Sequence, residues 1–318
     1  MTPATIVPVV LGCCPHPPRC LLCAPPPGPT SADVVRALIH NYRDRAGPEA
    51  PLRVGFYGGA PPSDAQLDAL DGLPFHARVR PDLLTRSEAA RLVDRGAVGI
   101  ELDALTFDDV ALRAAGRKYS GRQLDEQLAG IAALGAQPGI VLAPGLPHTD
   151  HPAAVRDAER AAPAVRFARI HPVLVLARSG LHDAHMEGRY VALELGEAVT
   201  TCRVMLDVFD AAGVEVIRIG VNPGPDGVGR AVAGPRHPAL RQLVEARRAL
   251  EVLLVRAAAA RRGSRIEIRC HPADETTTRG PRNQHVRTLR AAHGLAAVTV
   301  RPDPSLPRGE YVIDEVLT

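Results

Sequence analysis

Two hydrophobic patterns alternate along the chain between residues 6 and 219. Short apolar runs rich in β-branched residues are typical of buried strands, and longer stretches with apolar residues at three- and four-residue spacing are typical of helices. The predicted strands are Ile6–Leu11, Leu52–Tyr57, Ala77–Arg80, Val98–Leu102, Gly139–Ala143, Val165–Ile170 and Val214–Ile219. The predicted helices are Val34–Arg43, Asp64–Leu70, Glu88–Arg95, Gln123–Leu134, Ala153–Ala161 and Glu194–Ala212. Such alternation predicts parallel βα units with right-handed crossovers, as a barrel or an open sheet.

The chemically unusual groups of this region follow the predicted strands. In a barrel, the carboxyl ends of parallel strands meet at one rim, where active sites form, so their placement favours a barrel over an open sheet. Thr30 and Ser63 are predicted helix N-caps, because their hydroxyls can accept hydrogen bonds from free backbone amides. The groups that follow strands are the cysteine loop, Tyr57-Gly58-Gly59, Arg80-Pro81-Asp82, Glu101, Pro144-Gly145-Leu146-Pro147 and His171-Pro172.

The pattern changes after about residue 235. The pattern predicts one long helix, rich in arginine and alanine, at His237–Arg262. It also predicts short strands at Ile266–Arg269 and Val298–Arg301, on either side of another helix. We therefore expect a core barrel at 1–234 and a small α+β extension at 235–318, packed on the barrel.

A cysteine-rich loop follows the first predicted strand. Cys14, Cys20 and Cys23 are expected to converge on one soft metal centre, since thiolates are the ligands such centres prefer. Three thiolates are one fewer than a closed structural zinc site uses, whereas around a cubane they leave one iron free. Two alternatives remain: Cys13 replaces Cys14 as the first ligand, or His16 or Cys13 completes a zinc site.

Composition limits the classes of function. Hydrophobic residues make up 46% of the 318 residues and charged residues 23%, which is typical of a globular protein, and no apolar run approaches the length of a membrane span. The first residues lack the basic start of a secretion signal, so we expect a cytoplasmic protein. The clustered cysteines form no spaced disulfide framework and favour a metal or redox role. A net charge of +3 gives little support to a polyanionic partner.

Several short motifs follow one another along nearly the whole chain. They are Cys14-Pro15-His16, Cys20-x2-Cys23, Phe56-Tyr57-Gly58-Gly59, Arg80-Pro81-Asp82, Pro144-Gly145-Leu146-Pro147, Arg169-Ile170-His171-Pro172, Gly188-Arg189-Tyr190, Val216-Ile217-Arg218-Ile219-Gly220 and Ala233-Gly234-Pro235-Arg236-His237-Pro238. In this order they resemble the motifs of radical S-adenosylmethionine (SAM) proteins related to the catalytic subunit of Elongator. The chain most resembles the short bacterial members, which lack the acetyltransferase domain.

The resemblance implies a partial (β/α)6 TIM-like barrel that holds a [4Fe-4S] cluster and SAM. One electron from a donor of the flavodoxin or ferredoxin type would then lead to SAM cleavage and a 5′-deoxyadenosyl radical, which abstracts hydrogen from the substrate. Because Elongator relatives act on a wobble uridine, the resemblance suggests an RNA substrate, although fold analogy alone does not fix a reaction.

The same resemblance implies a set of cofactor-binding residues. Backbone carbonyls at Gly58 and Gly59 would approach the SAM methionine, because glycine has no Cβ to obstruct it. Glu101 would bond the ribose or the ammonium group. Gly139 and Gly145 would leave space for adenine. Arg80 and Arg169, with Asp82, would orient SAM or bind an anionic part of the substrate. No catalytic residue is assigned.

Each feature also has a structural interpretation. Gly58-Gly59 and Pro144–Pro147 are consistent with tight turns, and Arg80 with Asp82 is consistent with a salt bridge at a barrel rim. The arginines of the predicted helix His237–Arg262 form either a solvated face or a nucleic-acid contact. The alternative function is accordingly a degenerate barrel with a zinc-binding or scaffold role and no radical chemistry.

Overall fold

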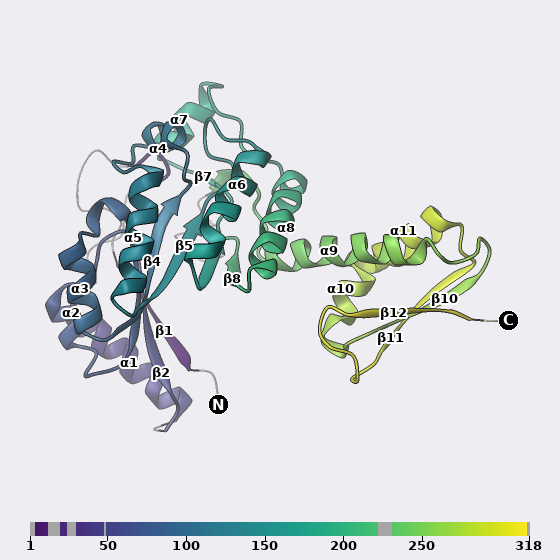
Figure 1. Cartoon of the computed structure of the whole chain (residues 1–318), viewed down its shortest axis with the longest axis horizontal. Coiled ribbons are helices and arrows are strands. Elements are labelled where there is room, and N and C mark those ends of the chain that lie inside the picture. The colour runs from purple at the N-terminus through teal and green to yellow at the C-terminus, as the bar shows by residue number, and fades with distance from the viewer. Residues whose placement is uncertain (1–3, 12–19, 24–29, 48, 222–230, 317–318) are drawn as a thin grey trace. The chain divides into compact units, whose positions relative to one another are not determined.

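A sheet of seven parallel strands forms the centre of the first of two compact units, Met1–Pro238 (Figure 1). The structure is a computed structural model that describes residues 4–11, 20–23, 30–47, 49–221 and 231–316. The strand order is β1-β2-β3-β4-β5-β6-β8, and every neighbouring pair is parallel. The strands are β1 Thr5–Val10, β2 Leu52–Tyr57, β3 Phe75–Val79, β4 Ala97–Leu105, β5 Gln137–Leu142, β6 Phe167–Ile170 and β8 Glu215–Ile219. All seven predicted strands are present, as six strand–helix units followed by β8.

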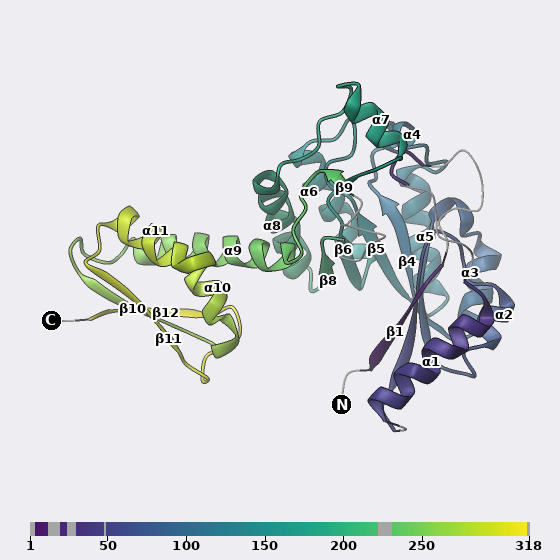
Figure 2. The same ribbon diagram turned by 180° about the vertical axis from the view of Figure 1, so that it is seen from behind.

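The helices of this unit lie on the outer face of the curved sheet (Figures 1 and 2). On β4, Ile100 and Leu102 are fully buried on the helix side, whereas Gly99, Glu101 and Asp103 alternate with them on the other side. The helices are α1 Ala32–Ala46, α2 Asp64–Asp68, α3 Arg86–Asp94, α4 Asp109–Ala114, α5 Gly121–Ala133, α6 His151–Ala161, α7 Gly180–Met186 and α8 Leu195–Ala211, with 3-10 turns at Pro81–Leu83 and Ala162–Ala164.

The inner face of the sheet is concave. His76 on β3 stacks on Phe167 on β6 with ring centroids 5.3 Å apart, although β4 and β5 lie between these strands. Glycines on the two intervening strands make this possible: a Cβ at Gly99 would lie 3.3 Å from the His76 ring, and one at Gly139 would lie 2.3 Å from the Phe167 ring. The sheet is therefore curled into a partial barrel, as predicted.

Helix starts follow the expected chemistry with one shift. Ser63 caps α2 in a full capping box with Gln66, as predicted. The cap of α1 is Ser31 rather than Thr30, so that prediction is wrong by one position. The Thr30 hydroxyl instead donates to the Val10 carbonyl at 2.6 Å and ties the start of α1 to the end of β1.

Short elements were missed by the sequence reading. Helices α4 and α7 span less than two helical turns each, too few for a periodic apolar stripe. A two-stranded antiparallel sheet of β7 (Val175–Leu176) and β9 (Ala231–Ala233) is also present.

The second unit, Ala239–Thr318, has its own apolar core. Its sheet has the order β11-β10-β12, with β10–β11 parallel and β10–β12 antiparallel. Leu253 and Ala257 of α9 pack with Ile268 of β10 and Leu289 of α11. The elements are α9 Leu240–Ala257, β10 Arg265–Cys270, α10 Glu275–Arg279, α11 Gln284–His293, β11 Ala297–Pro302 and β12 Tyr311–Val316, with 3-10 turns at Pro272–Asp274 and Pro281–Asn283.

Helix α9 is shorter at both ends than the predicted His237–Arg262. The backbone N–H of Arg261 donates to the Glu315 carboxylate of β12 instead of continuing the helical ladder. Strand β12 was not predicted, because its acidic residues break the apolar alternation. Throughout the described ranges, no helix is both long and apolar enough to cross a membrane.

Candidate metal and cofactor site

Two of the predicted metal ligands face each other after the end of β1. The Sγ atoms of Cys20 and Cys23 are 3.4 Å apart, and Cys20 is buried. Leu21 between them fixes the loop: its N–H donates to the Ala115 carbonyl at 3.0 Å, and its carbonyl accepts from the Leu181 N–H at 2.9 Å. Cys13, Cys14 and His16 lie outside the described residues. Within the described part of the chain, no third metal-binding side chain joins the pair.

The surroundings of this cysteine pair favour the thiolate form of Cys20. A hydrogen bond with Cys23 lowers the pKa of Cys20 to about 6 against the opposing effect of burial, and the Arg117 guanidinium contributes to the lowering. The buried Nε and Nη1 atoms of Arg117 have no hydrogen-bond partner among the described residues. Two soft donors beside a buried cation with unused N–H groups fit an anionic iron–sulfur cluster.

Asp103 joins this cation to the inner face of the sheet. Its carboxylate accepts from Arg117 Nη2 at 3.1 Å and from Arg78 Nε at 3.1 Å, with a second, shorter contact to Arg78 Nη2. Although burial opposes ionisation, the two arginines hold the pKa of Asp103 well below its usual range. A continuous chain of charges therefore runs from the cysteine pair to β3 and β4.

The predicted cofactor residues Glu101 and Arg169 bind each other. Arg169 Nε donates to the two Glu101 carboxylate oxygens at 2.8 and 3.1 Å, and Glu101 is 2% exposed. Arg169 Nη2 also lies 3.4 Å from the Tyr57 hydroxyl, and its guanidinium stands over the Tyr57 ring. Burial raises the pKa of Glu101 despite the attraction of Arg169 and Arg78. This pair fixes two polar groups in the centre of the concave face.

The predicted glycine pair lies where β1 and β2 end. A Cβ at Gly58 would come within 2.7 Å of the carbonyl oxygen of Leu11, the residue that directly follows β1. The Gly59 carbonyl accepts a hydrogen bond of 2.9 Å from the Arg80 N–H. Gly58 thus permits the close packing of the two strand ends, and one lone pair of the Gly59 carbonyl is already used.

The other predicted glycines contact side chains of the protein. Gly139 lies under the Phe167 ring, as described above. A Cβ at Gly145 would lie 2.7 Å from the Leu193 side chain, and the Gly145 carbonyl accepts from the Tyr190 hydroxyl at 2.6 Å. The space near Gly139 therefore holds an aromatic ring of the chain itself, and access near Gly145 depends on a movable leucine.

Arg80 is 5% exposed and binds Asp82 through two nitrogens, with Nε 2.9 Å from Oδ1. This is the arrangement expected of a salt bridge at a barrel rim.

The sequence analysis assigned no site role to three residues of this region. Arg78 and Asp103 lie two positions from Arg80 and Glu101 on their strands, and the two-residue side-chain period of a strand could have identified them. Arg117 lies in the turn after α4, and no periodic pattern marks such a position.

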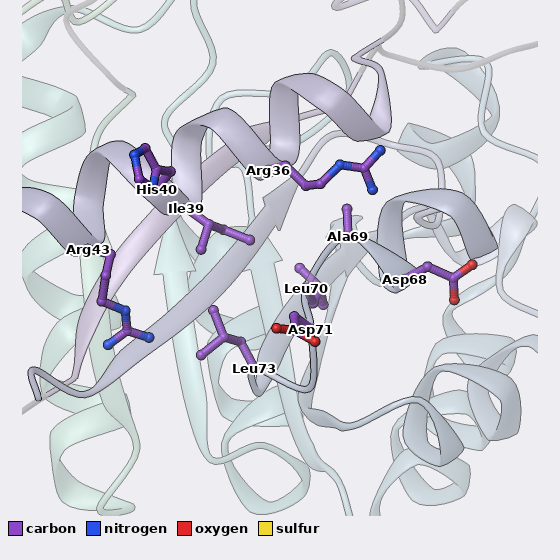
Figure 3. Close-up of a pocket in the computed structure, with 9 residues that line it drawn as sticks. All are labelled: Arg36, Ile39, His40, Arg43, Asp68, Ala69, Leu70, Asp71 and Leu73. Carbon is purple, nitrogen blue, oxygen red and sulfur yellow. The ribbon is translucent and has the colours of Figure 1, made fainter. Parts of the chain in front are cut away.

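A separate pocket of about 530 Å³ lies on the helical side of this unit (Figure 3). Side chains of α1 face the turn that follows α2. None of the predicted site residues lines it. Its lining residues are Arg36, Ile39, His40, Arg43, Asp68, Ala69, Leu70, Asp71 and Leu73.

Comparison with known proteins agrees with this architecture. Residues 165–251 match the Radical_SAM C-terminal domain. Among solved structures, Elp3 from the archaeon Methanocaldococcus infernus is similar over 78% of this chain and 63% of its own, with a TM-score of 0.58 and 16% identity. Methylornithine synthase (PylB) has a TM-score of 0.51 at 12% identity over 74% of this chain and 75% of its own. Coproporphyrinogen III oxidase (HemN) from Escherichia coli has a TM-score of 0.50 at 13% identity over 66% and 53%.

The curled parallel sheet and the matched domain together define the chain as a protein with the radical SAM fold. Within that class, it is similar to the proteins related to Elp3, as the order of its motifs indicated, at low sequence identity. The chain spans just under two thirds of the length of that archaeal protein. A comparison with curated proteins finds no match.

Proposed function

We propose that the chain is a radical SAM enzyme in which Cys14, Cys20 and Cys23 hold a [4Fe-4S] cluster and the concave face of the sheet binds SAM. The observation that carries this proposal is the Cys20–Cys23 pair, in which the buried Cys20 lies near the Arg117 guanidinium. A cation at this position favours the thiolate form that iron requires.

The bound cofactors would supply the radical chemistry: one external electron breaks the sulfur–C5′ bond of SAM, yielding methionine and a 5′-deoxyadenosyl radical that takes a hydrogen atom from the substrate. The residues of the chain would position these groups. Glu101, which Arg169 holds in one orientation, would accept a hydrogen bond from the ribose or ammonium of SAM, and the absence of a side chain at Gly58 lets the end of β2 lie close to Leu11.

The remaining parts of the proposal concern partners. We propose a one-electron donor of the flavodoxin or ferredoxin type and a cytoplasmic location, where thiols remain reduced. An RNA substrate is proposed by analogy with the proteins related to Elp3.

Replacing Gly59 by valine tests the cofactor part. We expect Gly59→Val to block reductive SAM cleavage while iron content stays normal, because a branched side chain would obstruct the strand end where the SAM methionine is proposed to bind. Iron analysis and release of 5′-deoxyadenosine after anaerobic reconstitution measure the two effects separately. Gly130→Val on α5, where a Cβ would meet nothing within 4 Å, is the control. Normal cleavage by Gly59→Val would assign the glycine pair to a turn alone, and a colourless wild type with one zinc per chain would contradict the proposal itself.

Two arginines of the segment predicted as the helix His237–Arg262 are poor candidates for RNA contacts, because each of them binds a glutamate. Arg247 binds Glu251 at 2.7 Å, and Arg261, beyond the helix, binds Glu315 at 3.2 Å. We therefore expect the double variant Arg247→Gln and Arg261→Gln to keep RNA affinity within about twofold of the wild type at about 50 mM salt, since ion-paired cations release few counterions. Filter binding with a transfer RNA checks this. A tenfold loss of affinity would place the RNA contact on this segment.

A further inference from the structure

A β-bulge turns Arg218 onto the concave face. Along β6 and β8, Ala168 pairs with Val216 and Arg169 pairs with Arg218, so Ile217 has no partner. Without this extra residue, Ile217 would oppose Arg169, and Arg218 would point to the helix side. Beyond the bulge, Ile219 pairs with Ile170 and is buried on that side. Bulges of this kind commonly redirect a side chain next to a binding site.

The bulge places two guanidinium groups side by side. Like charges directly opposite each other on neighbouring strands are destabilising. Arg169 is neutralised by Glu101, whereas the one acceptor of Arg218 among the described residues is the Gly220 carbonyl, 3.1 Å from Nε. The two terminal nitrogens of Arg218 thus have no protein acceptor within that part of the chain. Burial and the charge of Arg169 lower the pKa of Arg218.

Among the residues that the structure describes, the groups around this pair add no net negative charge. Burial and nearby arginines hold the pKa of His171 well below its usual value, and its buried Nε2 has no partner in the described ranges. Burial and Arg53 likewise lower the pKa of His76 to about 4, so both imidazoles are neutral near pH 7. Strands β3 to β6 carry two carboxylates on this face, those of Glu101 and Asp103, and arginine side chains already bind both of them.

The concave face is open along the edge strand β1. Ile6 and Val10, whose strand partners are Arg53 and Tyr57 of the same face, are 42% and 57% exposed. Arg218 lies on the other edge strand, β8, and is itself partly exposed, so a ligand can reach this face from either edge. An excess of guanidinium groups on an accessible face is complementary to an anion.

We propose that Arg218, together with Arg169, binds an anionic group of the substrate, a phosphate or a carboxylate. This inference rests on the proposed function, because it assigns the substrate of the same concave face. The planar Arg218 guanidinium, held by the Gly220 carbonyl through Nε, presents its two terminal nitrogens for a bidentate contact.

Anion binding to the full chain without reconstituted iron provides the first test. Inorganic phosphate and acetate are titrated against wild type and Arg218→Gln, with binding measured by ³¹P or ¹³C NMR line broadening. We expect Arg218→Gln to weaken binding at least tenfold. Arg218→Lys should restore part of it, because lysine keeps the positive charge but cannot make the bidentate contact of a guanidinium. Arg122→Gln on α5 is the control, since the Arg122 side chain is 87% exposed and pairs with Glu126. Equal phosphate and acetate affinities for wild type and Arg218→Gln would overturn the proposal.

A second measurement separates the substrate from the cofactor. SAM affinity of the reconstituted protein is measured by equilibrium dialysis, and we expect it to differ by less than about twofold between wild type and Arg218→Gln. A tenfold loss of SAM affinity would show that Arg218 binds the cofactor carboxylate and would overturn the proposal. Titration with an RNA decanucleotide at several salt concentrations distinguishes RNA phosphate, for which affinity falls steeply with salt, from a small anionic substrate. Failure of the wild type to cleave SAM would contradict the radical SAM activity and leave the anion-binding result standing.

Discussion

Cys20→Ala and Cys23→Ala are each expected to reduce bound iron to background after anaerobic reconstitution. With one thiolate missing, the loop can no longer hold a cluster that needs three cysteine ligands. The Sγ atoms of these residues lie 3.4 Å apart in the loop that Leu21 ties to the rest of the unit, so no other described cysteine can replace either one. Iron analysis and the visible absorption of the reconstituted protein measure the effect.

Matched controls come from the other described cysteines. Cys202 on α8 and Cys270 on β10 are fully buried, and burial raises the pKa of both thiols, to about 12 for Cys202. Cys202→Ala and Cys270→Ala should therefore leave iron content unchanged. Iron retained by Cys20→Ala or Cys23→Ala, or lost in either control, would contradict the ligand assignment.

Asp103→Asn is expected to lower the free energy of unfolding by about 3–5 kcal/mol, because it leaves the buried Arg117 guanidinium and the partly buried Arg78 guanidinium without their shared carboxylate. The Asp103 and Arg117 side chains are 10% and 3% exposed. Urea unfolding monitored by circular dichroism gives the difference. Asp125→Asn is the control: Asp125 forms a pair with Arg160 that is nearly half exposed, and its loss should change stability by less than about 1 kcal/mol.

The pH dependence of this difference has a defined sign. The folded-state pKa of Asp103 is lowered below the unfolded value of about 3.9, so its stabilising effect is fully present above about pH 5 and is lost as pH falls through the folded pKa. The stabilities of wild type and Asp103→Asn should therefore converge in acid. A difference that stays constant down to about pH 2 would show that the carboxylate charge is not the cause.

The main sheet could be predicted because burial on one face imposes a strong pattern. Strands such as Leu52–Tyr57 carry β-branched and aromatic residues that have no other stable placement, and the predicted and observed bounds of this strand coincide. The start of α1 was misplaced because Thr30 and Ser31 have equivalent hydroxyls, and only the contact of Thr30 with the Val10 carbonyl separates them.

The candidate site was less predictable because its geometry depends on pairing between distant strands. Glu101 and Arg169 could be singled out one by one, but their contact follows from the curl of β4, β5 and β6. The bulge at Ile217 leaves no mark in a single sequence, since one extra residue in a short apolar run does not alter the run. The position of Arg117 was not predictable either, because it depends on the turn that follows α4, where the Arg117 N–H donates to the Leu112 carbonyl.

Two buried N–H groups of Arg117 have no acceptor among the described residues. Such donors lower the stability of a chain for as long as the neighbouring cysteine loop holds no anion to accept from them. A ligand that supplies those acceptors binds the folded form alone and shifts the folding equilibrium by mass action. Chains made during iron shortage would open more often and be degraded sooner by proteases, so the abundance of the protein would follow the supply of its own cofactor.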